Sequence, residues 1–139
     1  MNVLIIEDEI LIQKSLLKII GAKGHSCIGT SLGKESIELI MNNEFDLIIC
    51  DLMLRDTTGF DIIEATKVKL SPAEISQKFT IITAYCSEQV LERARGYGCR
   101  VFEKPFVDLM KTIDTMLYPN KIVEKKYEFE EKSTNCSQA

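Results

Sequence analysis

The chain has 139 residues, of which 45% are hydrophobic and 27% are charged, and its formal net charge is −4 at pH 7. This length suits one domain with a single core, able to bury roughly two-thirds of the surface that the unfolded chain exposes. The apolar runs are far shorter than the roughly 20 residues that cross a bilayer, and the acidic balance gives no clustered basic face for nucleic acid. We therefore expect neither membrane insertion nor direct nucleic-acid binding.

The cysteine and histidine content limits the metal and redox chemistry. The five cysteines are odd in number and form no Cys-x-x-Cys pair, and His25 is the single histidine. These counts disfavour a zinc site and favour a reducing compartment. No basic segment precedes the first apolar run, as an export signal would require. The expected location is the cytoplasm.

Short apolar runs alternate with helical patterns along the chain. Strands are predicted at residues 3–6, 26–30, 45–50, 79–83 and 100–102. Apolar residues three or four positions apart predict helices within residues 12–20, 37–41, 62–66, 90–97 and 106–117. Strands that alternate with helices form βαβ units with right-handed crossovers. The predicted fold is α/β: a doubly wound parallel sheet of five strands, in the order 2-1-3-4-5, with five helices on its two faces.

The composition changes after residue 117. Residues 118–139 contain Pro119, four lysines and four glutamates, and they end in a polar segment. We predict one domain over residues 1–117, followed by a charged tail over residues 118–139 that is disordered or forms a short helix starting near Asn120.

Polar residues gather where the predicted strands end. They are Glu7, Asp8 and Glu9 after the first strand, Asp51 after the third, Thr83 and Ala84 at the fourth, and Lys104 after the fifth. In a doubly wound sheet, ligands bind beyond the carboxyl ends of the strands, where the strand order reverses. The first and third strands are neighbours in the order 2-1-3-4-5, so we expect Asp8 and Asp51 to lie close together.

These residue types suit phosphoryl chemistry at Asp51. Carboxylates are ligands for Mg²⁺, which also binds phosphate oxygens, and we predict that Glu7 and Asp8 hold this cofactor. Glu9 is expected to face solvent at the start of the first helix, where the helix dipole favours an anion. The ammonium of Lys104 and the hydroxyl of Thr83 are groups that hold a phosphoryl group on a carboxylate. The predicted reaction forms an acyl phosphate on Asp51.

Four segments, "VLIIEDE", "DLIICDLMLRDTTGFDII", "FTIITAY" and "FEKPF", resemble the receiver domains of bacterial two-component response regulators. The resemblance covers residues 2 to about 117 and implies a CheY-like, flavodoxin-like fold. It implies Asp51 as phosphoacceptor, Mg²⁺ ligands from Glu7, Asp8, Asp51 and the Met53 carbonyl, phosphoryl binding by Thr83, Ala84 and Lys104, a loop glycine at Gly59, and a cis peptide before Pro105.

The predicted switch region consists of Val101, Phe102 and Pro105. The family places an aromatic residue three positions before the lysine, where this chain has Val101, and Phe102 comes one position later. In the family, a rotamer change of that aromatic side chain reports phosphorylation. This role does not transfer directly to Phe102. Met53 and Tyr85 stand two positions after the acceptor and after the switch threonine, at positions that in the family influence how fast water reaches the acyl phosphate. Bulky residues at both positions imply slow hydrolysis.

The resemblance implies a phosphorylation-activated switch in a phosphorelay. Such a switch catalyses its own phosphorylation and dephosphorylation but is not a conventional enzyme. It receives the phosphoryl group from a histidine kinase or histidine phosphotransfer protein and acts on a downstream effector protein through altered contacts, and it can dimerise when phosphorylated. Two alternatives stay open: an interaction module that acts independently of phosphorylation, and a receiver excised from a longer regulator or hybrid kinase.

Rival classes lack their required residues. An aspartyl phosphatase needs a second acid two positions after the first, where Met53 stands, and a P-loop NTPase needs a glycine-rich loop ending in Lys-Ser/Thr, which is absent.

Overall fold

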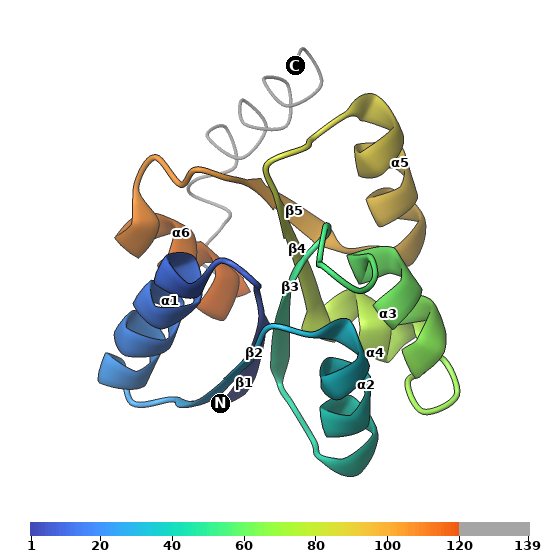
Figure 1. The fold of residues 1–139 in the computed structure, drawn as a ribbon, viewed down its shortest axis with the longest axis horizontal. Helices are drawn as coiled ribbons and strands as arrows, with labels where there is room; N and C mark the ends of the chain where they lie inside the picture. The colour runs from blue at the N-terminus through green and yellow to red at the C-terminus, as the bar shows by residue number, and fades with distance from the viewer. Residues whose placement is uncertain (120–139) are drawn as a thin grey trace.

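The computed structural model describes residues 1–119, in which strands and helices alternate (Figure 1). The elements are β1 (Asn2–Ile6), α1 (Ile10–Ala22), β2 (Ser26–Thr30), α2 (Gly33–Asn42), β3 (Leu47–Asp51), α3 (Gly59–Thr66), α4 (Pro72–Lys78), β4 (Phe79–Thr83), α5 (Glu88–Tyr97), β5 (Arg100–Glu103) and α6 (Leu109–Leu117). The strands form one parallel sheet in the order β2-β1-β3-β4-β5. The predicted fold, strand order and five strands are confirmed.

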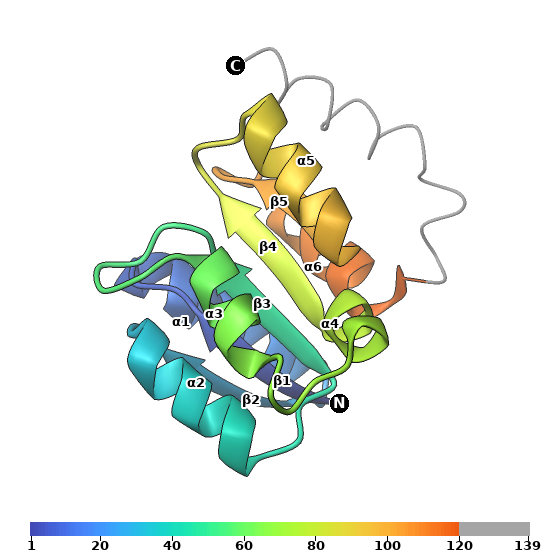
Figure 2. The ribbon, with the colours of Figure 1, turned by 90° about the vertical axis from the view of Figure 1, so that its right-hand side faces the viewer.

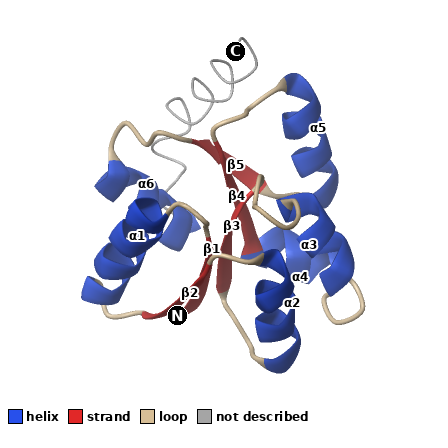
Figure 3. Ribbon diagram, viewed as in Figure 1, coloured by secondary structure: helices blue, strands red, loops and turns tan. Residues whose placement is uncertain are grey.

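Helices cover both faces of the sheet, α1 and α6 on one side and α2 to α5 on the other (Figures 2 and 3). The central strands β3 and β4 are buried along their whole length, as expected for strands covered on both faces. Alternate strand residues therefore enter two separate hydrophobic clusters. Ile49 packs with Leu16 of α1 and Ile113 of α6, whereas its neighbour Ile48 packs with residues of α2 to α5.

The prediction of five helices was wrong by one, because α4 was missed. This helix has seven residues, and Ile75 is its only buried one, so it shows no periodic apolar stripe. A different signal was present at its start. The Ser71 side chain accepts a hydrogen bond from the Glu74 N–H, and the Glu74 side chain accepts one from the Ser71 N–H, with Pro72 at the first turn. This is a capping box, and its Ser-x-x-Glu pattern is readable in the sequence.

The predicted tail falls almost entirely outside the described residues, including the helix expected near Asn120. Its first residue, Tyr118, follows α6, and its hydroxyl lies 3.0 Å from Nε2 of His25. Within residues 1–119, no helix combines the length and the apolar character needed to cross a bilayer.

Candidate functional site

The predicted site residues lie where the strands end at the carboxyl edge of the sheet. Asp51 is the last residue of β3 and Thr83 the last of β4, while Glu7 directly follows β1 and Lys104 directly follows β5. Because β1 and β3 are neighbours, with Ile6 opposite Cys50, the residues that follow them share one end of the sheet. The topology thus brings four loops together, as the sequence predicted.

Lys104 joins three of these strand ends. Its ammonium donates hydrogen bonds to Glu7 Oε1 at 2.9 Å, to Asp51 Oδ2 at 3.0 Å and to Glu9 Oε1 at 3.1 Å. An ammonium has three N–H donors, so these bonds use its full capacity. Glu7, Asp51 and Lys104 are 0%, 4% and 6% exposed, whereas the Glu9 side chain is 60% exposed. The centre of the site is therefore a buried ion cluster with one partner at the surface.

Burial dominates the ionisation of this cluster. It raises the pKa of Glu7 to about 7, although the Glu9 N–H and the Lys104 ammonium both act to lower it. Burial also acts to lower the pKa of Lys104, but the hydrogen bonds to Glu7 and Asp51 outweigh it, and the net change is upward. Lys104 therefore stays charged at neutral pH, and the excess of negative charge lies on the carboxylates.

The carboxylates also form a group suited to a cation. Glu7, Asp8 and Asp51 each offer one oxygen, and these oxygens lie within 4.8 Å of one another. Hard oxygen donors with a net negative charge are what Mg²⁺ prefers, so the residues present fit the predicted cofactor. Met53 lies beside them, since its N–H donates to Asp51 Oδ1 at 3.2 Å.

Thr83 and Ala84 occupy the neighbouring strand end. Asp51 pairs with Ile82, which puts Thr83 one position further along β4. The Thr83 hydroxyl is fully buried and accepts a hydrogen bond from the Tyr85 N–H at 2.9 Å, so its own hydrogen stays available to donate. Ala84 is exposed beside it.

The predicted switch residues divide between the two faces of the sheet. Val101 is half-buried and packs against Leu91 of α5. Phe102 is buried in the other cluster, together with Ile113 of α6. The aromatic ring of β5 thus lies on the side away from α5, because adjacent residues of a strand point to opposite faces of the sheet. The peptide bond before Pro105 is cis, as the resemblance implied.

Two acidic side chains join segments that are distant in the sequence. Glu9 begins α1 as expected, but its carboxylate contacts Lys104, 95 positions away, rather than simply facing solvent. Asp56, in the loop after β3, accepts hydrogen bonds from the N–H groups of Gly33 and Lys34 at the start of α2, and these bonds lower its pKa. Neither contact leaves a local sequence signal, because each joins segments that only the fold brings together.

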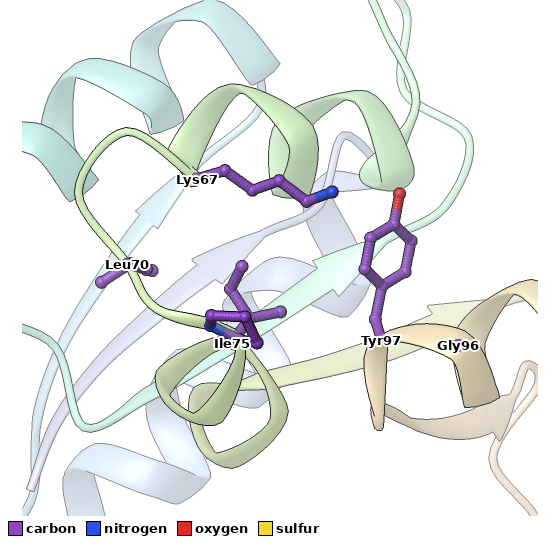
Figure 4. Close-up of a pocket in the computed structure, with 6 residues that line it drawn as sticks. Lys67, Leu70, Ile75, Gly96 and Tyr97 are labelled. Atoms are coloured by element: carbon purple, nitrogen blue, oxygen red, sulfur yellow. The ribbon is translucent and has the colours of Figure 1, made fainter.

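A separate pocket of about 450 Å³ lies between α3, α4 and α5 (Figure 4). It is lined by Lys67, Leu70, Pro72, Ile75, Gly96 and Tyr97. Its polar groups already have partners, since both Lys67 and the Tyr97 hydroxyl bind Glu64. The carboxylate cluster, not this pocket, carries groups arranged for chemistry.

The family model described as "Response regulator receiver domain" matches residues 3–114. The chain belongs to this family. Among curated relatives of this receiver, the "Polar-differentiation response regulator DivK" of Brucella ovis is 29% identical over 116 residues, which cover 83% of this chain and 92% of the relative.

Solved structures agree with this assignment. The receiver domain of HemR from Leptospira biflexa superposes with a TM-score of 0.71 at 25% identity, covering 81% of this chain and 87% of the other. The Vibrio cholerae chemotaxis protein CheY4 gives a TM-score of 0.70 at 22% identity, covering 83% and 97%, and at that identity it supports the fold alone. The receiver is thus a CheY-like domain of two-component signalling.

Proposed function

We propose that the Asp51 carboxylate of this receiver accepts a phosphoryl group from a histidine kinase or a histidine phosphotransfer protein in the cytoplasm. The observation that carries the proposal is the position of this carboxylate: it is buried, it lies 3.0 Å from the ammonium of Lys104, and it shares a cluster with Glu7 and Asp8. A charged acceptor, a fixed cation and a group of oxygen ligands for Mg²⁺ are the parts that phosphoryl transfer requires.

In the proposed reaction, an oxygen of Asp51 attacks the phosphorus of a phosphohistidine. The new O–P bond forms as the N–P bond breaks, and the imidazole leaves. Glu7, Asp8, Asp51 and the Met53 carbonyl would hold Mg²⁺, which would supply positive charge to neutralise the phosphoryl oxygens.

Three groups of this chain hold the product. Lys104 donates to one phosphoryl oxygen and the Thr83 hydroxyl to another, and the small side chain of Ala84 leaves room for the group. Two bulky residues stand at positions next to the site, Met53 two residues after the acceptor and Tyr85 two residues after Thr83, and they are 50% and 73% exposed. They screen the acyl phosphate from water, so we expect slow hydrolysis.

The proposed output is a change of protein contacts on α5, β5 and α6. When Thr83 and Lys104 are drawn toward the phosphoryl group, the strand ends β4 and β5 move with them, and the population of surface conformations shifts. A downstream effector protein, or a second copy of the receiver, then binds the altered face. Val101 lies on the α5 side of this region and Phe102 on the opposite side.

Intact mass spectrometry tests the acceptor directly. The receiver is incubated with acetyl phosphate and Mg²⁺, beside Asp51→Ala and a matched control, Asp61→Ala, which removes an exposed acid from the first turn of α3. We expect one added phosphoryl group in the wild type and in Asp61→Ala, removed by hydroxylamine, and none in Asp51→Ala or in EDTA. An adduct that persists in Asp51→Ala contradicts the assignment. No adduct on the wild type favours the phosphorylation-independent module.

A further inference from the structure

The hydrogen bond between Glu9 and Lys104 takes no direct part in the proposed phosphoryl transfer. Glu9 lies 3.1 Å from the ammonium and makes the third of its three carboxylate contacts. The other two partners, Glu7 and Asp51, are buried, whereas most of the Glu9 side chain is exposed. Glu9 is also absent from the group of oxygens suited to a metal.

The three contacts leave Lys104 without a spare donor. A phosphoryl oxygen on Asp51 therefore gains a hydrogen bond from Lys104 only if one carboxylate gives up its own. The loss of Glu7 would take the ammonium away from a fully buried carboxylate, which is costly. The loss of Glu9 returns a carboxylate to water, and an ion pair with one exposed partner contributes little. Of these two side chains, Glu9 is the one that Lys104 gives up at lower cost.

The released Glu9 has a second place to bind. Glu9 is the N-cap residue of α1. Within the described residues, its side chain makes no capping hydrogen bond to the N–H groups at the start of that helix. The first turn of α1 contains no acidic side chain. A carboxylate at a helix N-terminus is stabilised by the free N–H groups and by the helix dipole. When the Glu9 carboxylate moves from the Lys104 ammonium to the N-terminus of α1, its negative charge is still stabilised.

We propose that Glu9 is a positioning residue: it holds Lys104 in the unphosphorylated receiver and so limits the rate at which Asp51 is phosphorylated. This inference rests on the proposed function, because the effect of Glu9 is exerted through Lys104. It adds a residue that competes with the phosphoryl group for the lysine.

The test compares two substitutions that differ in charge. Glu9→Gln removes the charge, and Glu9→Asp keeps it but shortens the side chain to one that favours capping its own helix. The rate of phosphorylation by acetyl phosphate at saturating Mg²⁺ is measured for both, at low and high salt. We expect both variants to react about two- to fivefold faster than the wild type, the range given by one ion pair with an exposed partner. Glu35→Gln, in the first turn of α2, removes a similar exposed charge and is expected to react at the wild-type rate.

The outcomes separate the alternatives. If Glu9→Asp reacts at the wild-type rate while Glu9→Gln is faster only at low salt, Glu9 merely repels the anionic donor, and the proposal is overturned. Wild-type rates in both variants also overturn it, with Asp51 still the acceptor. A wild-type receiver that takes up no phosphoryl group overturns both this inference and the proposed function.

Discussion

At the residue scale, Glu7 determines how the charge of the site depends on pH. Its carboxylate is fully buried, and burial raises its pKa from 4.5 to about 7. A carboxyl group whose pKa is higher in the folded state favours folding when it is protonated. Its contribution is complete below pH 4.5 and is lost as the pH rises through about 7. Near neutral pH the receiver thus carries a buried charge that weakens the fold and attracts a cation.

Glu7→Gln removes this titration. In EDTA, we expect the free energy of unfolding of the wild type to fall by about 3 kcal/mol relative to Glu7→Gln as the pH rises from about 4.5 to about 8. Urea denaturation followed by circular dichroism at several pH values measures the difference. Mg²⁺ is expected to restore stability to the wild type at the upper end of this range, because a ligand that binds the folded state stabilises it. Parallel curves for the two proteins in EDTA would contradict the prediction.

Residue types and strand positions were enough to predict which of the candidate side chains lie together. Glu7, Asp51 and Lys104 come together because parallel strands end at one edge, a rule that needs no side-chain detail. The contact between Glu9 and Lys104 was not predictable in this way. The Glu9 carboxylate can bind either the N-terminus of α1 or the Lys104 ammonium. The two interactions have similar free energies, so the sequence does not show which one forms.

At the element scale, Gly59 sets how closely α3 approaches the end of β3. Its N–H donates to the Leu52 carbonyl at 2.8 Å. A Cβ at this position would lie 3.0 Å from the Asp51 carbonyl oxygen and 3.3 Å from Cys50 Sγ. A contact of 3.0 Å with backbone forces the helix or the strand to shift, and the strand carries Asp51.

Gly59→Ala is therefore expected to lower the free energy of unfolding by about 1–3 kcal/mol and to slow phosphorylation of Asp51. Gly21→Ala is the matched control, because Gly21 lies in α1 with nothing within 4 Å of an added Cβ. That variant is expected to be more stable by about 0.5–1 kcal/mol, with an unchanged rate. Urea denaturation and the acetyl phosphate assay measure both quantities. A Gly59→Ala receiver with wild-type stability and rate would show that the helix moves away without cost.

Helices and strands differed in how well the sequence predicted them. The strand bounds of β2 and β4 matched the prediction. Periodicity failed for α4, where only Ile75 is buried. A short helix that is stabilised by a capping box does not require an apolar stripe. The Ser71–Glu74 pattern was therefore the signal in the sequence that indicated this helix.

At the scale of the whole molecule, the site lies across the carboxyl ends of four neighbouring strands. Lys104 follows β5, and through its ammonium it joins the ends of β1 and β3, with β4 between. Each face of the sheet has its own hydrophobic cluster below this edge, one with α1 and α6 and the other with α2 to α5. A change in the partners of Lys104 would therefore act on strands that belong to both clusters.

This architecture predicts that residues 1–119 are sufficient for folding and phosphorylation. Both hydrophobic clusters and every proposed site residue lie within that range. Under reducing conditions, a chain that ends at Pro119 is expected to unfold in one cooperative transition, with a free energy of unfolding within about 1 kcal/mol of the full chain. It is also expected to be phosphorylated at the same rate. Urea denaturation and intact mass spectrometry of both chains provide the comparison, and a large loss of stability would assign the last 20 residues to the domain rather than to a tail.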